Sequence, residues 1–243
     1  MAILMEDSIE TDAAPRAALP KTPILITAAT RWEAGPLAKA LKLESSGDGG
    51  YEGLVGGRRV VLVKTGIGAK TTTDKLNGLN GSEWLLVISA GLCGSMQKDV
   101  RHGHVIADVR EVEFDFVGLL RETAQRLEIP FHFGKILHTN IVLKPDAKLA
   151  LGVEQRAIAC DMETAAVRRW TDGKTPAIAV RVVLDDLDEE ITTTFPEGED
   201  ALSLARFARD NAASLPALIR TGFRSSRAMK TLGKFLTAYL ETL

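Results

Sequence analysis

Runs of consecutive apolar residues alternate along this chain with segments of helical periodicity, and this alternation limits the fold more than any other feature. Four of the runs span residues 24–29, 59–63, 84–89 and 177–183. A strand that is apolar on both faces needs cover on both faces, as in parallel sheets flanked by helices. The sequence therefore predicts an α/β fold with a mostly parallel sheet covered by helices on both sides.

Length and composition suit this kind of fold. The chain has 243 residues, of which 45% are apolar and 26% charged, enough for one large α/β domain or two small ones. Residues 1–20 carry charges, alanines and prolines without periodicity, and we interpret them as a flexible tail. We expect residues 21–243 to form a single domain that ends in helices from about residue 200, broken near Pro216 and Gly222.

Charge and cysteine usage argue against several functions. A net charge of −2 and a pI of about 6.1 argue against a dedicated nucleic-acid binder. Cys93 and Cys160 form no Cys-x-x-Cys motif, so we expect a reducing compartment, without a disulfide framework or a cysteine-bound zinc. His102 and His104 lack a clear third ligand, so no metal is predicted. We find no signal peptide and no run that could span a bilayer, which predicts a cytoplasmic protein.

Polar and small residues follow several of the predicted strands. Glu33, residues 66–68, residues 91–94 and Asp185 each come just after an apolar run. In open α/β sheets, ligands bind at the carboxyl ends of the strands. These positions therefore predict one ligand site at that edge of the sheet.

Two of these positions are rich in glycine. The segment TGIG (residues 65–68) opens a predicted helix whose N-terminus favours an anion or a sugar oxygen, although a tight turn would use the same glycines. We interpret SAGLCGS (residues 89–95) as a small-residue turn, which either leaves room for a ligand over the backbone or is simply a packed corner. A nucleotide-dependent oxidoreductase is an alternative, but Gly66 and Gly68 lack the third glycine of that motif.

Two acidic segments bring carboxylates to the same edge. Asp161-Met162-Glu163 follows a buried strand and starts a predicted helix, where an acid either complements the helix dipole or lies near the core. A carboxylate near the core needs partners, and two ribose hydroxyls would serve. Asp185 begins an acidic run, most of which we interpret as a solvated loop, and its place at the strand end would let it reach a cleft.

Five segments together resemble the nucleoside phosphorylase and nucleosidase superfamily, which includes methylthioadenosine/S-adenosylhomocysteine nucleosidases. In chain order, they are ITAATRWE (26–33), KTGIG (64–68), SAGLCG (89–94), DMETAA (161–166) and VRVVLD (180–185). The resemblance covers about residues 23–190 and rests on the order and spacing of the segments. It implies a three-layer α/β/α sandwich around a twisted mixed sheet, and cleavage of the bond between a sugar and a purine-like base.

The resemblance also implies a role for each site residue. Asp185 would be the general acid that protonates purine N7, and Glu33 the acid that orients the attacking water. A purine leaves poorly until N7 is protonated, and a partly desolvated carboxylic acid can donate near neutral pH. The substrate-binding positions are Glu163 for the ribose hydroxyls, Met162 against the sugar, Arg181 at the polar end, Gly91 and Leu92 in the glycine segment, and Val142 and Leu143 along the base.

Three positions depart from the superfamily pattern. Leu92 and Leu184 stand where nucleosidases commonly have serines that help the water and the acid. Val142 replaces a common phenylalanine, so base stacking is altered as well. These departures weaken the assignment to methylthioadenosine in particular. They also make a nucleoside-binding module without catalysis an alternative, against which the three retained acids argue.

The group that receives the sugar is water or phosphate. A phosphorylase must hold phosphate, normally with arginines, and Lys64 stands in the second loop instead, which favours hydrolysis. Gly68 and Arg31 are the residues that would contact phosphate in a phosphorylase. Phosphate would then be a co-substrate, and no cofactor is expected.

The C-terminal segment adds a membrane hypothesis. From residue 215 onward, apolar residues such as Phe223 and Leu232 alternate with basic ones such as Arg224 and Lys234. This pattern is typical of helices that lie on membranes, and a packed helix pair is the alternative. The segment resembles hopanoid-associated phosphorylases, whose substrate is a lipid-linked adenine nucleoside. Superfamily members are often dimers or larger, which implies a homo-oligomer.

Overall fold

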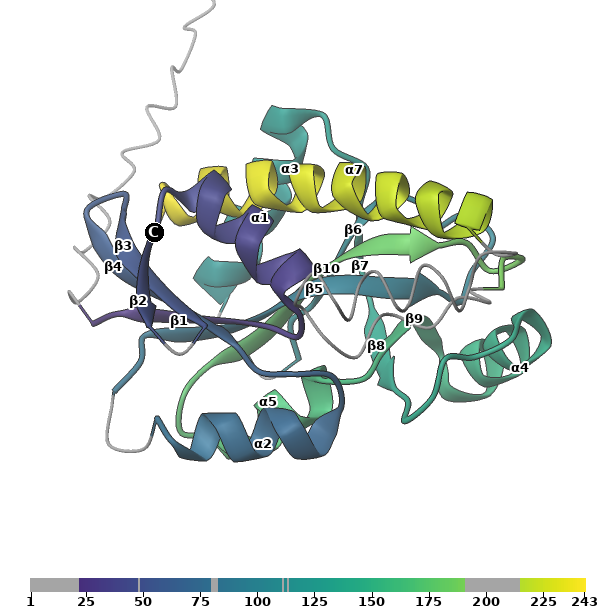
Figure 1. Cartoon of the computed structure of the whole chain (residues 1–243), viewed down its shortest axis with the longest axis horizontal. Coiled ribbons are helices and arrows are strands. Elements are labelled where there is room, and N and C mark those ends of the chain that lie inside the picture. Colours follow the sequence, from purple (N-terminus) through teal and green to yellow (C-terminus); the bar gives the residue numbers. More distant parts are fainter. Residues whose placement is uncertain (1–21, 48, 80–82, 111, 113, 191–214) are drawn as a thin grey trace, which may run out of the picture.

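Ten strands of the described part of the chain form one mixed sheet, and helices cover both of its faces (Figure 1). The structure is a computed structural model that describes residues 22–243 except residues 48, 80–82, 111, 113 and 191–214. The tail predicted for residues 1–20 and the helical stretch predicted to start near residue 200 lie outside the described residues. The predicted α/β/α architecture with a mixed sheet is confirmed.

Four strands make up the centre of the sheet. They are β1 (Ile24–Ala28), β4 (Arg58–Lys64), β5 (Leu86–Ser95) and β10 (Ala177–Asp185). In the order β4-β1-β5-β10 they are all parallel, and every residue of β1 and β10 is buried. Burial on both faces explains why the sequence shows continuous apolar runs here. Because the strands are parallel, their carboxyl ends meet at one edge of the sheet.

Antiparallel pairs at the flanks make the sheet mixed. The hairpin of β2 (Glu44–Gly47) and β3 (Gly50–Val55) adds to β4, and β6 (Val105–Asp108) runs antiparallel to β10 and parallel to β7 (Phe131–Phe133). The parallel pair of β8 (Lys135–His138) and β9 (Ala157–Asp161) joins the sheet through β9, which pairs antiparallel with the end of β5.

The helices divide between the two faces of the sheet. On one face, α1 (Arg31–Leu41) and α3 (Phe114–Leu127) pack against α7 (Leu215–Leu240), and on the other α2 (Ala69–Asn77) packs against α5 (Thr164–Thr171) (Figure 1). The remaining described helix, α4 (Pro145–Gln155), contacts β9. The largest hydrophobic cluster lies under α1 and α7, and a smaller one lies under α2 and α5.

Two local predictions are wrong. Residues 89–95 were expected to form a turn, but they are the second half of β5. β5 stays extended because β10 pairs with it as far as Gly94 and β9 then pairs with Gly94 and Ser95. The predicted break near Gly222 is also absent, because α7 is continuous over Leu215–Leu240. One exposed glycine inside a helix costs only about 1 kcal/mol. The break predicted near Pro216 adjoins residues 191–214, which lie outside the described residues.

The far half of α7 is a core helix. The side chains of Met229, Leu232, Phe235 and Leu236 are completely buried, whereas Ile219 and Phe223 are exposed. The far half still exposes basic side chains, among them Lys230 and Lys234. Among the residues that the structure describes, no helix has both the length and the apolar character that crossing a bilayer requires.

Candidate active site

Glu33 is held rigidly at the start of α1. Its Oε2 accepts hydrogen bonds from the backbone N–H of Thr30 at 2.9 Å and from its hydroxyl at 3.0 Å, the pattern of a capping box. Its Oε1 accepts a 2.8 Å hydrogen bond from the backbone N–H of Leu92 in β5. The carboxylate is therefore fixed by both oxygens while it is almost completely buried.

The glycine at position 91 makes room for this carboxylate. An ideal Cβ on Gly91 would lie 2.4 Å from Glu33 Oε1 and 2.6 Å from Arg181 Nη1, and the residue has φ +149°. No real Cβ approaches another atom so closely. Glu33 and Arg181 consequently approach each other over the bare backbone of β5, in an arrangement that only glycine allows.

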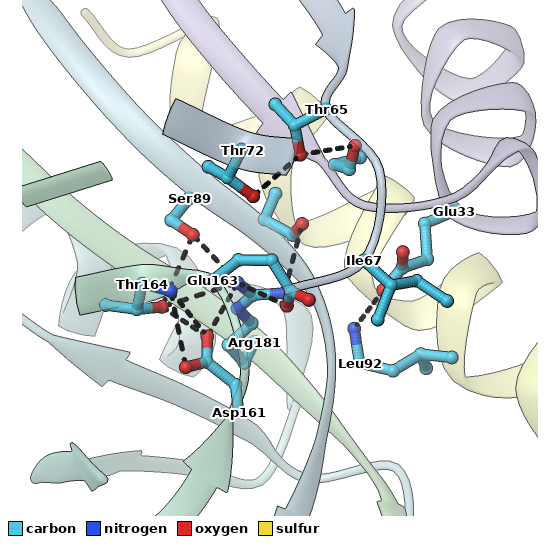
Figure 2. A network of polar contacts seen from close by, with 12 residues as sticks. Glu33, Thr65, Ile67, Thr72, Ser89, Leu92, Asp161, Glu163, Thr164 and Arg181 are labelled. Carbon is cyan, nitrogen blue, oxygen red and sulfur yellow. Dashed lines mark hydrogen bonds and ion pairs between the residues drawn. The ribbon is translucent and has the colours of Figure 1, made fainter. Parts of the chain in front are cut away.

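Arg181 is the centre of a buried charge network (Figure 2). Its Nη2 lies 2.6 Å from Asp161 Oδ2, 2.8 Å from Ser89 Oγ and 3.6 Å from Glu163 Oε2. Asp161 also accepts hydrogen bonds from the backbone N–H and hydroxyl of Thr164, in the first turn of α5. A buried guanidinium needs this compensation, so Asp161 orients Arg181 rather than facing a ligand. The sequence placed Asp161 beside Glu163 but did not indicate this role.

Glu163 is the residue that joins the network to the glycine loop. It occupies the N-cap position of α5, and its Oε1 accepts a 2.9 Å hydrogen bond from the backbone N–H of Gly68. Burial raises the pKa of Glu163 to about 7, although Arg181 opposes the shift. Near neutral pH its carboxyl therefore exists in both protonation states, and it can accept or donate a hydrogen bond.

Asp185 lies at the end of β10, level with Gly94 of the neighbouring strand. Its Oδ2 forms an ion pair with Lys148 of α4, whose side chain is 1% exposed. Burial raises the pKa of Asp185, and the ammonium of Lys148 opposes that shift. An ideal Cβ on Gly94 would lie 3.0 Å from Asp185 Oδ2, so a glycine again gives a carboxylate room beside β5.

Lys148 is a site residue that the sequence did not indicate. Lysine is almost never fully buried unless it is paired, so a lysine in a helix is expected to face solvent. In α4 the reverse holds, because Lys148 and Gly152 are buried while Leu149 and Val153 are exposed. The sequence of α4 therefore indicates a buried Lys148 only when it is already known which face of the helix is buried.

The other predicted substrate contacts occupy separate places. Met162 is half-buried between β9 and α5, and Leu92 holds Glu33 through its backbone rather than its side chain. Leu143 is buried in a small cluster with Met96, Ala157 and Cys160, whereas Val142 is 56% exposed. The structure therefore does not bring Val142 and Leu143 together as one wall.

The predicted site residues form two groups. The first group consists of residues in direct contact with one another: Glu33, Gly91, Arg181, Glu163 and Gly68. Met162 immediately precedes Glu163 in the sequence. Asp185 belongs to the second group, with the Lys148 side chain. On β10 it stands four residues beyond Arg181, or about 13 Å of strand at ~3.3 Å per residue.

Two further predictions concern phosphate and metal. Arg31, predicted as a phosphate contact, lies with its guanidinium 4.5 Å from the centre of the Trp32 ring, while the N–H of Gly68 is donated to Glu163. Within the described residues, no cluster of three or more histidine, cysteine, aspartate or glutamate side chains could hold a metal ion.

Comparison with known proteins identifies the class to which this fold belongs. No protein-family model and no curated protein matches the sequence. Solved structures do match, and they share the fold of nucleosidases that the sequence resemblance implied.

Three of these structures illustrate the similarity. Futalosine hydrolase of Helicobacter pylori strain 26695 is 18% identical, with a TM-score of 0.68 over 91% of this chain and 98% of that chain. A 5′-methylthioadenosine/S-adenosylhomocysteine nucleosidase of Helicobacter pylori is 17% identical, with a TM-score of 0.69 over 93% and 100%. The corresponding enzyme of S. pneumoniae is 18% identical, with a TM-score of 0.67 over 90% and 99%. The chain is thus similar in fold over nearly its whole length to these hydrolases.

Proposed function

We propose that this chain cleaves the N-glycosidic bond of a purine-type nucleoside by hydrolysis. The observation that carries the proposal is the pair of buried carboxylates, Glu33 and Glu163, that flank the Arg181 guanidinium beside Gly91. Glu33 follows β1 and Glu163 follows β9, and two carboxylates that meet beside β5 suit a substrate with hydroxyl groups and a developing positive charge. The solved structures similar in fold include enzymes named as a nucleosidase and a futalosine hydrolase, which supports this class.

In this proposal Glu163 binds the sugar. Its Oε1 is engaged by the N–H of Gly68, and its Oε2 lies 3.6 Å from Arg181, which leaves lone pairs on both oxygens for ribose hydroxyls. When the glycosidic bond breaks, positive charge develops on the sugar ring. An ionised Glu163 stabilises that charge.

Glu33 orients the attacking water. Its Oε2 accepts two hydrogen bonds from Thr30, whereas its Oε1 accepts one from Leu92 and keeps a second lone pair. In this proposal the attacking water donates a hydrogen bond to that remaining lone pair of Oε1. The water oxygen adds to C1′ of the sugar, and its proton passes to the Glu33 carboxylate. Because Leu92 carries no hydroxyl, only the backbone of this position takes part.

Asp185 protonates the base. As the C1′–N9 bond breaks, its electron pair passes into the purine ring, and the proton from Asp185 arrives at N7. General acid catalysis of this kind contributes about 10²–10⁴-fold to the rate. Both steps together add one water to the nucleoside and release a free sugar and a free base.

Water is favoured over phosphate as the acceptor. The N–H of Gly68 is already donated to Glu163, and the guanidinium of Arg31 stacks on Trp32. A phosphorylase would need these groups for the phosphate anion.

The second candidate is a phosphorylase for a lipid-linked adenine nucleoside. The observation that favours it is the exposure of Ile219 and Phe223 at the start of α7, with Arg220 between them. Arg220 and Arg224 also pair with Glu189, close to the Asp185 end of the site. A peripheral membrane contact, a cytoplasmic location and a homo-oligomeric state remain predictions.

The test is release of free base from a panel of nucleosides, with and without phosphate. The panel contains adenosine, inosine, 5′-methylthioadenosine, S-adenosylhomocysteine, futalosine and an alkyl-linked adenosine. We expect base release and free ribose without phosphate from at least one of them. Release that requires phosphate would replace the hydrolase with the phosphorylase, and no release from any member would leave a nucleoside-binding module as the better description.

A further inference from the structure

The ammonium of Lys148 has a complete set of partners. Its side chain is 1% exposed, and it donates to Asp185 Oδ2, to the backbone oxygen of Asp186 at 2.9 Å and to that of Glu189 at 2.9 Å. An ammonium group has three N–H donors, and all three are used. Asp185 contacts the ammonium through its carboxylate, whereas Asp186 and Glu189 contact it through backbone carbonyl oxygens.

The two groups therefore form one buried ion pair with no net charge. If Asp185 took up a proton while Lys148 stayed charged, a buried ammonium would remain beside two neutral carbonyls, which is unfavourable. Two arrangements of the pair have no net charge: an ammonium with a carboxylate, or an amine with a carboxylic acid. They differ only in the position of one proton. A lone buried carboxyl, as the general acid is usually pictured, does not describe this site.

We propose that Lys148 is the source of the proton that Asp185 passes to the base. This inference rests on the function proposed above. An N–H bond of Lys148 breaks as an O–H bond forms at Asp185 Oδ2. That O–H bond breaks as N7–H forms, and the C1′–N9 electron pair leaves with the base. Glu33 then releases to solvent the proton that it took from the attacking water, and solvent returns one proton to the Lys148 amine. The cycle therefore consumes only the nucleoside and one water.

The surrounding structure keeps the two groups in contact. An ideal Cβ on Gly152 would lie 2.9 Å from the backbone oxygen of Met96, so α4 packs tightly beside the end of β5. On the other side, Glu189 accepts from the Asp186 N–H at 3.0 Å and pairs with Arg224 of α7 at 2.5 Å. These contacts fix the segment after Asp185, which carries the carbonyl acceptors of Lys148.

A purely structural role for Lys148 is the competing explanation. In that case the lysine only ties α4 to the segment after β10, and Asp185 acts as an ordinary acid whose proton affinity the lysine lowers. The two explanations predict opposite pH behaviour. If Lys148 holds the proton, its removal moves the high-pH limit of kcat/KM to lower pH. If it only lowers the proton affinity of Asp185, its removal moves that limit to higher pH.

Other charged or titratable groups near Lys148 and Asp185 could also contribute to the pH profile. They are Cys93 of β5, Cys160 of β9, His102, Asp186 and Glu189 of the adjoining loops, and Arg224 of α7. Both thiols stay protonated near neutral pH because burial raises their pKa, and both carboxylates form ion pairs with arginines. His102 is the remaining group, and a His102→Gln variant measured beside the wild type separates its contribution to the pH profile from that of the pair.

The experiment compares Lys148→Met and Lys148→Arg with the wild type. Arginine keeps the positive charge but does not release a proton in proteins. The matched control is Lys144→Met, because Lys144 is a 78% exposed lysine immediately before the same helix. Each protein is assayed from pH 5 to 10 with the nucleoside that the wild type cleaves best and with p-nitrophenyl riboside, whose leaving group needs no protonation.

We expect both Lys148 variants to lose at least about 100-fold in kcat/KM for the nucleoside. For p-nitrophenyl riboside we expect a change of less than about threefold, and in Lys148→Met the residual nucleoside activity should have its high-pH limit at lower pH. Lys144→Met should behave as the wild type with both substrates.

Several results would overturn the proposal. Rescue by arginine would show that charge alone is needed, and a parallel loss with both substrates would show that the lysine is structural. A pH limit that stays in place or moves upward would also refute the proton transfer. If Lys148→Met does not fold, the arginine variant decides on the same criteria. Failure of the proposed function is recognised separately, because then the wild type itself releases no base from any nucleoside.

Discussion

Replacing Gly91 by alanine tests whether the arrangement of Glu33 and Arg181 controls the chemistry. The new Cβ would lie 2.4 Å from Glu33 Oε1, whereas ordinary contacts of Cβ atoms begin at 3.4 Å. The carboxylate would therefore have to move by about 1 Å, and a displacement of this size at a reacting group costs roughly 100-fold in rate. The hydrogen bonds from Thr30 and Leu92 oppose the movement. If the carboxylate moves by less than this, the remaining steric strain lowers the stability of the folded protein.

The assay is kcat/KM for base release together with the thermal unfolding midpoint. We expect Gly91→Ala to lose about 100-fold in kcat/KM while it remains folded. Gly222→Ala is the matched control, because an ideal Cβ there meets no atom within 4 Å and the residue lies in an exposed part of α7. That variant should keep full activity and gain up to about 1 kcal/mol, since alanine is the better helix former. A folded Gly91→Ala with activity within threefold of the wild type would refute the reasoning.

Three other predictions follow from the same contacts. The pKa of Glu163 is raised to about 7, so the folded state binds its proton more tightly than the unfolded state. The free energy of unfolding should therefore fall by up to about 3 kcal/mol as the pH rises from 4.5 to 7. In urea titrations, Glu163→Gln should lack this part of the pH dependence. An identical pH dependence in both proteins would contradict the prediction. Asp185→Asn should lower base release by ~10²–10⁴-fold with little change in inhibitor affinity by calorimetry, and full retained activity would disprove its role as the acid. The Cys93 and Cys160 thiols are buried with raised pKa values, so a thiol-disulfide reagent such as DTNB should label them only in denaturant; rapid labelling of the native protein would contradict the burial.

Much of the fold could be predicted from local pattern. Apolar runs such as residues 177–183 are buried in the central strands, and Thr30 and Glu33 have the spacing of a capping box at the start of α1. Glu33, Gly91 and Arg181 meet in space, whereas Asp185 lies at the end of β10 with Lys148. These features are determined by neighbouring residues and by the period of the sheet.

Predictions made from composition alone were less successful. The small residues of the segment at 89–95 favour a turn, but small residues equally allow a strand to be approached closely from both sides. Here Glu33 and Asp185 approach β5 at Gly91 and Gly94. The identity of the residues was informative, but the backbone conformation depended on β9 and β10, which pair with this strand.

The sequence by itself determined an α/β sheet, the order of its elements and a set of acids near strand ends. The tertiary structure alone decided the partners of those acids. Asp161 neutralises Arg181, and Lys148 neutralises Asp185, across 20 and 37 positions of the chain. Local periodicity cannot predict such pairs. The two groups attract each other strongly only when folding removes both of them from water at the same place. The chemistry proposed for Asp185 consequently depends on a lysine that the sequence pattern would place in solvent.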